Sequence, residues 1–214
     1  MQKYISEFIG TFVLLVSIVG SGIAGQQYTN DQMVILVSHA VVIGLTLIFI
    51  IGIFANFSGA HFNPIVSILF FLQKELSKKD LCLFISIQIT AAILGTIFAN
   101  YIFGLSILEI SSNIRSGTNI YISEIFASFG LLMVILLSKV GGKNIVAFNV
   151  GIYITAAIIF TSSASFANPA VSIARIFTES FAGINPSTVI FFIGSQVIGM
   201  FGAYFLYNHL FKTK

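Results

Sequence analysis

Six long apolar stretches, separated by short polar segments, set the pattern of the chain. An α-helix needs about 20 predominantly apolar residues to cross the hydrocarbon core of a bilayer, and each stretch is close to that length. The segments between them are too short to hold a separate domain. The pattern therefore predicts an all-α membrane protein with six transmembrane helices. They cover residues 4–25, 33–54, 80–104, 121–140, 144–162 and 186–211.

Two shorter apolar segments, 63–72 and 168–178, interrupt this pattern, and each opens on an Asn-Pro pair. The pair lies inside a motif written twice, as Ser-Gly-Ala-His-Phe-Asn-Pro-Ile-Val-Ser-Ile over 58–68 and as Ser-Ala-Ser-Phe-Ala-Asn-Pro-Ala-Val-Ser-Ile over 163–173. Asn as a cap, followed by Pro at the first helical position, is favourable at a helix N-terminus. A helix of about ten residues rises about 15 Å, which is half of a roughly 30 Å hydrocarbon core. We therefore expect two re-entrant half-helices, which enter from opposite faces and meet near the middle of the membrane.

The two halves of the chain also match outside these segments. Glu7 opens Glu-Phe-Ile-Gly-Thr-Phe in the first span, and Glu124 opens Glu-Ile-Phe-Ala-Ser-Phe in the fourth. Three spans per half place the halves in inverted orientations, an architecture typical of transport proteins. Non-helical backbone is tolerated at membrane depth only when it is buried in protein or lines a watery cavity. The repeat predicts a single channel domain over 1–214, with inverted repeats at approximately 1–110 and 118–214.

Composition agrees with a membrane protein, and the distribution of charge predicts its orientation. The chain is 57% hydrophobic and 8% charged, with a mean hydropathy of +1.02, which excludes a soluble globular domain. Cytoplasmic loops carry the positive excess, and the lysines fall at the termini and after the second and fourth spans, so we expect both termini in the cytoplasm. These lysines are Lys3, Lys74, Lys78, Lys79, Lys139, Lys143, Lys212 and Lys214. The net charge of +3 then reflects membrane topology, and no basic patch suits nucleic acid.

Polar residues within the apolar segments are the candidates for function. The amides of Asn63 and Asn168 can cap the half-helices and also present N–H donors to a passing oxygen; capping alone is the alternative. Glu7 and Glu124 lie inside spans, where a carboxylate needs partners, so we expect them to hold loop backbone N–H groups rather than to relay protons. His61 is either a residue of the cytoplasmic mouth or a structural histidine. We expect no catalytic residue, metal or cofactor.

The doubled Asn-Pro segment, the matching Glu-led spans and the third spans led by Gln88 and Gln196 resemble the aquaporin and aquaglyceroporin family, the major intrinsic proteins. The resemblance covers nearly the whole chain, and its motif positions fall on Asn63-Pro64-Ile65 and Asn168-Pro169-Ala170. It implies a right-handed bundle of six tilted helices with two half-helices. It also implies a homotetramer in the cell (inner) membrane, with one pore in each subunit.

One departure from the family pattern bears on selectivity. Members usually follow the second Asn-Pro-Ala with an arginine that belongs to the narrow outer filter, whereas this chain has Val171. The other filter positions implied by the resemblance are Ile43, Ser165 and a residue of the fifth span. Counting from Asn168 gives Ala156 for the latter and counting from Gly151 gives Ile158, which we favour. Arg175, one helical turn beyond Val171, either reaches into the outer vestibule or pairs at the surface or with loop carbonyls.

Aliphatic residues at these positions would make the filter wider and less polar. We therefore expect a passive channel for small uncharged solutes, with water and glycerol-like polyols among them. The stretch 166–175, with 181–184 after it, resembles a bacterial subgroup linked to arsenic-resistance genes. That resemblance implies neutral metalloid acids such as arsenite or methylated arsenicals. The alternatives are a strict water channel, an ion-coupled inverted-repeat transporter and a scaffold without flux.

Overall fold

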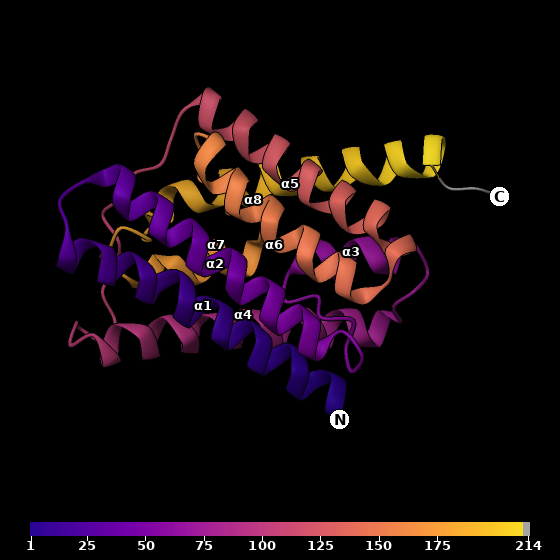
Figure 1. Cartoon of the computed structure of the whole chain (residues 1–214), viewed down its shortest axis with the longest axis horizontal. Coiled ribbons are helices and arrows are strands. Elements are labelled where there is room, and N and C mark those ends of the chain that lie inside the picture. Colours follow the sequence, from indigo (N-terminus) through magenta and orange to yellow (C-terminus); the bar gives the residue numbers. More distant parts are fainter. Residues whose placement is uncertain (212–214) are drawn as a thin grey trace.

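The computed structural model describes residues 1–211, so Lys212 and Lys214 of the predicted cytoplasmic lysines lie outside the described residues. Six long helices, matching the six predicted spans to within a few residues, form the bundle (Figure 1). This confirms the predicted fold class. The helices are α1 (Gln2–Tyr28), α2 (Gln32–Phe54), α4 (Lys78–Ile102), α5 (Thr118–Ser138), α6 (Lys143–Phe160) and α8 (Pro186–Leu206).

The two half-helices begin at the predicted prolines. They are α3 (Pro64–Leu72) and α7 (Pro169–Ala174), and α7 continues as a 3₁₀ turn over Arg175–Phe177. Asn63 and Asn168 cap them, because each side-chain oxygen accepts the backbone N–H two residues further on, at 3.1 and 3.0 Å. The second half-helix is thus shorter in α form than the predicted 168–178.

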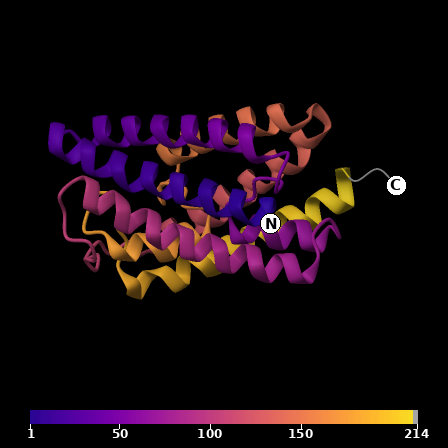
Figure 2. The same cartoon turned by 90° about the horizontal axis from the view of Figure 1, so that it is seen from below.

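The helices pack in two corresponding groups. Helix α1 packs against α2 and α4, and α5 packs against α6 and α8, while α2 contacts α6 between the groups. Helices α3 and α7 contact each other and lie inside the bundle against α4 and α8. In Figure 1, α3 lies toward the end that holds both termini and α7 toward the other end, and Figure 2 shows the same elongated bundle from below.

Glycines permit the closest helix crossings in both groups. A Cβ atom at Gly95 of α4 would lie 2.6 Å from the carbonyl oxygen of Phe12 in α1. One at Gly199 of α8 would lie 2.5 Å from the carbonyl oxygen of Ile125 in α5. Small residues allow helix backbones to approach in this way in membrane proteins. Each group thus contains one close crossing of this kind.

The outward faces of the bundle are apolar. Large side chains such as Leu45, Phe49, Phe126 and Ile190 are more than half exposed, and all six long helices are long and apolar enough to cross a membrane. Such faces suit contact with lipid rather than water. The chain is therefore a multi-pass membrane protein.

Candidate functional site

A cavity of about 280 Å³ extends along the bundle axis between the helices. Its lining reaches from Lys143, at the start of α6 near the end that holds the termini, to His39, near the start of α2 toward the other end. Helices α1, α2, α5 and α6 line it mainly with aliphatic side chains. These include Leu14, Ile18, Ile43, Leu47, Ile51, Leu131, Ile135, Val150, Ile154 and Ile158.

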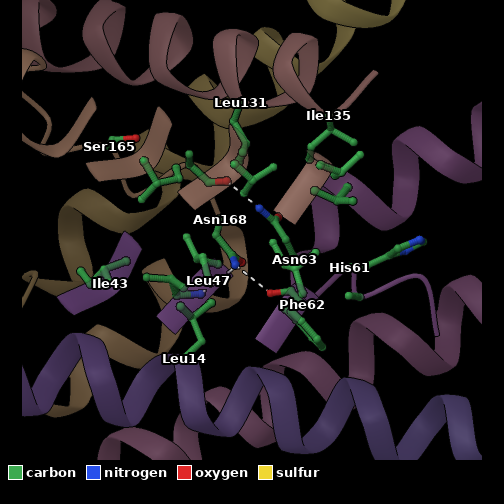
Figure 3. A pocket seen from close by; sticks show the side chains of 18 of the residues that line it. Leu14, Ile43, Leu47, His61, Phe62, Asn63, Leu131, Ile135, Ser165 and Asn168 are labelled. Atoms are coloured by element: carbon green, nitrogen blue, oxygen red, sulfur yellow. Dashed lines mark hydrogen bonds between the residues drawn. The ribbon is translucent and has the colours of Figure 1, made fainter. Parts of the chain in front are cut away.

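The two half-helix caps meet at the middle of this cavity. Asn63 Nδ2 donates to the carbonyl oxygen of Ala167 at 2.7 Å, and Asn168 Nδ2 donates to that of Phe62 at 2.8 Å. Figure 3 shows this reciprocal pair, in which each amide crosses to the opposite loop. An amide NH₂ group carries two hydrogens, so each asparagine keeps one donor after this bond. Both residues line the cavity, which lets that donor serve a passing oxygen.

Strained backbone precedes both caps at matching positions. Ala60 and Phe62 have φ of 53° and 50°, and the corresponding Ser165 and Ala167 have φ of 44° and 46°. A non-glycine residue in this region costs about 1–3 kcal/mol and persists only where its surroundings determine it. The loops must therefore be held in place by other groups.

Two buried carboxylates hold them. Glu7 accepts the backbone N–H groups of His61 and Phe62 at 2.9 and 2.8 Å. Glu124 does the same in the second half, where the N–H groups of Phe166 and Ala167 lie at 3.3 and 2.6 Å. Neither carboxylate is among the described residues that line the cavity.

A glutamine from each third span completes each carboxylate site, a role that the sequence analysis missed. Gln88 Nε2 donates to Glu7 at 2.8 Å and to Ser67 Oγ at 3.0 Å. Gln196 Nε2 donates to Glu124 at 2.7 Å and to Ser172 Oγ at 2.9 Å. The glutamines thus join the carboxylates to the half-helices. A glutamic acid in the first span and a glutamine in the third span recur in both halves of the sequence, and this repetition is the signal that could have revealed the link.

The four expected filter residues all border the cavity and are buried: Ile43, Ile158, Ser165 and Val171. Ala156, the alternative to Ile158, lies instead on the exposed surface of α6. Ser165 Oγ is buried and has no hydrogen-bond partner among the described residues. In Figure 3, Ile43 and Ser165 lie on one side of the asparagine pair and His61 on the other.

His61 borders the cavity and is held by neighbouring side chains. Its ring borders the cavity, and its Nδ1 lies 3.0 Å from Ser67 Oγ. It also packs against Phe70 and Phe84, with ring centroids 4.6 and 5.4 Å away. It is therefore a structurally held histidine at the wall of the cavity.

Arg175 pairs with a loop carbonyl at the cavity wall and not at the surface. It is buried and borders the cavity, its Nε donates to the carbonyl oxygen of Ala182, and its guanidinium carbon lies 3.5 Å from the ring centroid of Phe166. His39, to which the sequence analysis assigned no role, borders the same cavity. Its signal in the sequence is a polar residue inside a span, one helical turn before Ile43.

Comparisons with known proteins agree with this geometry. The family model "Major intrinsic protein" matches residues 1–165. Aquaglyceroporin AqpS of Rhizobium meliloti (strain 1021) is 39% identical over 198 residues, which cover 92% of this chain and 85% of that protein. Aquaporin NIP1-1 of Arabidopsis thaliana is 29% identical over 144 residues, which cover 63% of this chain and 48% of that protein. The solved structure of the aquaglyceroporin from Plasmodium falciparum is similar in fold, with a TM-score of 0.73 at 22% identity, and covers 98% of this chain and 96% of its own.

Proposed function

We propose that an aliphatic ring forms the outer constriction of this protein, which belongs to the major intrinsic protein family. Members of that family are passive, non-enzymatic channels, and this chain is one for water and small neutral solutes such as glycerol. The ring consists of Ile43, Ile158 and Val171, with Ser165 as its polar member. The observation that carries the proposal is that all four are buried and border one cavity.

The chemistry of this ring favours uncharged solutes with an apolar face. Aliphatic side chains offer no hydrogen bond to replace lost hydration, so a fully polar species is disfavoured there. Glycerol-like polyols, and neutral metalloid acids such as arsenite or methylated arsenicals, lose less because part of their surface is apolar or weakly hydrated. At the centre, the half-helix N-termini each carry a partial positive charge of about 0.5, which disfavours cations.

The buried carboxylates support passive flux over ion coupling. Of the ionisable residues that the sequence offers for ion coupling, Glu7 and Glu124 are not among the described residues that line the cavity. His61, by contrast, lines it and is held there by Ser67. Both carboxylates are also occupied by N–H donors of the loops and glutamines. They act as loop supports in this account.

The ring is tested by restoring an arginine at its valine. We expect Val171→Arg to reduce glycerol flux at least about tenfold and to spare water, because a long cationic side chain narrows the ring and adds donors that suit water. Val171→Met is the matched control, since it adds length without charge. Stopped-flow light scattering on proteoliposomes measures both fluxes. Unchanged glycerol flux in folded Val171→Arg would mean that this residue does not line the constriction.

We further propose a homotetramer in the cell membrane with cytoplasmic termini. The lysines of the described chain lie at the N-terminus and within 73–79 and 139–143, which are at the end of the bundle that holds both termini. This distribution supports the orientation, because cytoplasmic segments carry the positive excess. Native mass spectrometry tests the assembly. Labelling of the single cysteine, Cys82, by an impermeant maleimide tests the orientation, because it should react from the cytoplasmic side.

A further inference from the structure

Two polar side chains border the cavity beyond the aliphatic ring. His39 precedes Ile43 by one turn of α2, and Arg175 follows Val171 by one turn at the end of α7. Helix α2 starts at the end of the bundle away from the termini, and α7 runs from the middle toward that same end. Both residues are therefore displaced from the ring in the same outward direction.

Arg175 brings a buried charge without an ion pair to this position, and the Glu124 carboxylate is close enough to interact with it electrostatically. Its side chain is 3% exposed, and the ion pairs of the described chain involve only Lys3 with Asp80 and Lys139 with Glu75. A guanidinium has five N–H donors, of which the Nε–H is used by the carbonyl oxygen of Ala182. An ionisable residue at membrane depth is a functional candidate, because burying a charge without an ion pair is costly.

The surroundings of Arg175 hold the guanidinium in place. The guanidinium carbon lies over the ring of Phe166, 3.5 Å from its centroid. The backbone N–H of Ile184 donates to the carbonyl oxygen of Arg175 at 3.2 Å. These contacts fix the side chain between the second Asn-Pro loop and the segment 181–184. The charge is therefore preorganised at the wall of the cavity.

His39 is held beside it. Its Nδ1 lies 2.8 Å from Ser21 Oγ, and its ring meets Phe181 edge-on at 5.6 Å between centroids. Arg175 and Arg115 are both close enough to interact with the imidazole electrostatically. Since Nδ1 is engaged by Ser21, Nε2 is the atom left for a solute.

We propose that His39 and Arg175 form an outer polar ring, one helical turn outside the aliphatic ring, in which Arg175 supplies the fixed positive charge that rejects cations. This inference rests on the proposed channel function and assigns its cation barrier to a residue outside the usual filter position. A fixed charge acts strongly there because the buried wall screens it less than water does. The remaining N–H donors replace the hydration of a neutral polyol, whereas a cation gains nothing from them.

A charge series at Arg175 tests the proposal. Arg175→Gln keeps an N–H donor for Ala182 but removes the charge, and Arg175→Lys keeps the charge. The matched control is Arg115→Gln, because Arg115 also contacts Phe166, at 5.4 Å, and binds the carbonyls of Phe181 and Gly183, yet does not border the cavity. Potassium conductance is measured in planar bilayers, and glycerol entry into proteoliposomes reports that each variant is folded.

We expect Arg175→Gln to raise potassium conductance at least about tenfold, because it removes a poorly screened unit charge from the pathway. Arg175→Lys and Arg115→Gln should remain tight to potassium. An Arg175→Gln channel that passes glycerol but still excludes potassium would overturn the proposal. Equal leakage in the Gln and Lys variants would also overturn it, because the hydrogen bond to Ala182 would then be what matters.

A second measurement probes the electrostatic potential at position 39 while Arg175 is left in place. In a Cys82→Ser background, a cysteine is introduced by His39→Cys and modified with anionic or cationic methanethiosulfonate reagents from the outside. We expect the ratio of anionic to cationic reaction rates to exceed that of a free thiol by about tenfold or more. A ratio equal to that of the free thiol would refute the outer polar ring, even if Arg175→Gln failed to fold. Absence of glycerol flux in the unmodified chain would instead count against the proposed function.

Discussion

At the scale of single residues, the buried polar side chains of this channel each satisfy several backbone groups at once. Asn63 uses its oxygen to cap α3 and its nitrogen to bind the opposite loop, and Asn168 does the same for α7. Glu7 and Glu124 accept hydrogen bonds from loop N–H groups that lie outside any helix. Since an unpaired buried polar group costs about 1–3 kcal/mol, these hydrogen bonds stabilise the strained loops at membrane depth.

Replacing Glu7 tests this structural role. We expect Glu7→Gln to lower the stability of the protein by about 1–3 kcal/mol, because its NH₂ group would then face the N–H donor of either His61 or Phe62, which bind different oxygens of Glu7. Flux per folded channel should stay close to wild type. Thermal unfolding in detergent measures the first effect and stopped-flow flux the second.

The control is Glu109→Gln, at an exposed position of the 103–117 connection, for which we expect no change in stability. Loss of flux per folded channel in Glu7→Gln, without loss of stability, would favour a proton-coupled mechanism instead.

Sequence patterns predicted the motif residues well but could not orient isolated polar ones. The asparagines and glutamic acids each occur once in each half, within matching motifs, so the internal repeat identified them. His39 has no counterpart in the other half of the chain. Whether it faces the cavity or the lipid depends on the rotation of its helix, which a nearly uniform apolar pattern does not define. Arg175 could be assigned to the cavity wall only after the segment 181–184 had folded back over it.

At the scale of elements, two half-helices are held in place by long helices that cross very closely. The crossing of α5 and α8 brings Glu124 within reach of Gln196, as that of α1 and α4 does for Glu7 and Gln88. The starts of α3 and α7 were predictable from Asn-Pro chemistry. The early end of α7 was not, because it depends on tertiary contacts of the 3₁₀ turn that follows.

The closeness of the α5–α8 crossing gives a prediction at this scale. We expect Gly199→Val to lower stability by about 1–3 kcal/mol, because even its Cβ would lie 2.5 Å from the carbonyl oxygen of Ile125. Gly194→Val on the same helix is the control, since a Cβ there has no neighbour within 4 Å. Thermal unfolding of both variants in detergent decides the matter; equal melting temperatures would mean that the crossing tolerates a side chain.

At the scale of the whole molecule, an apolar exterior encloses a mainly aliphatic cavity, and polar groups lie at several levels along it. From the end that holds the termini, a solute would pass His61, then the asparagine pair, then the aliphatic ring, and last the outer polar ring. Hydropathy alone predicted the membrane-spanning exterior. The order of polar groups inside required the folded chain, because residues from both halves alternate along the wall.

The central claim is that this cavity conducts neutral solutes larger than water. Stopped-flow light scattering on proteoliposomes, comparing osmotic water permeability with glycerol-driven reswelling of the wild-type channel, tests it most directly. We predict rapid glycerol entry, well above that of empty liposomes. Rapid water flow without glycerol entry would contradict the claim, and would mean that the constriction is narrower than its aliphatic side chains imply.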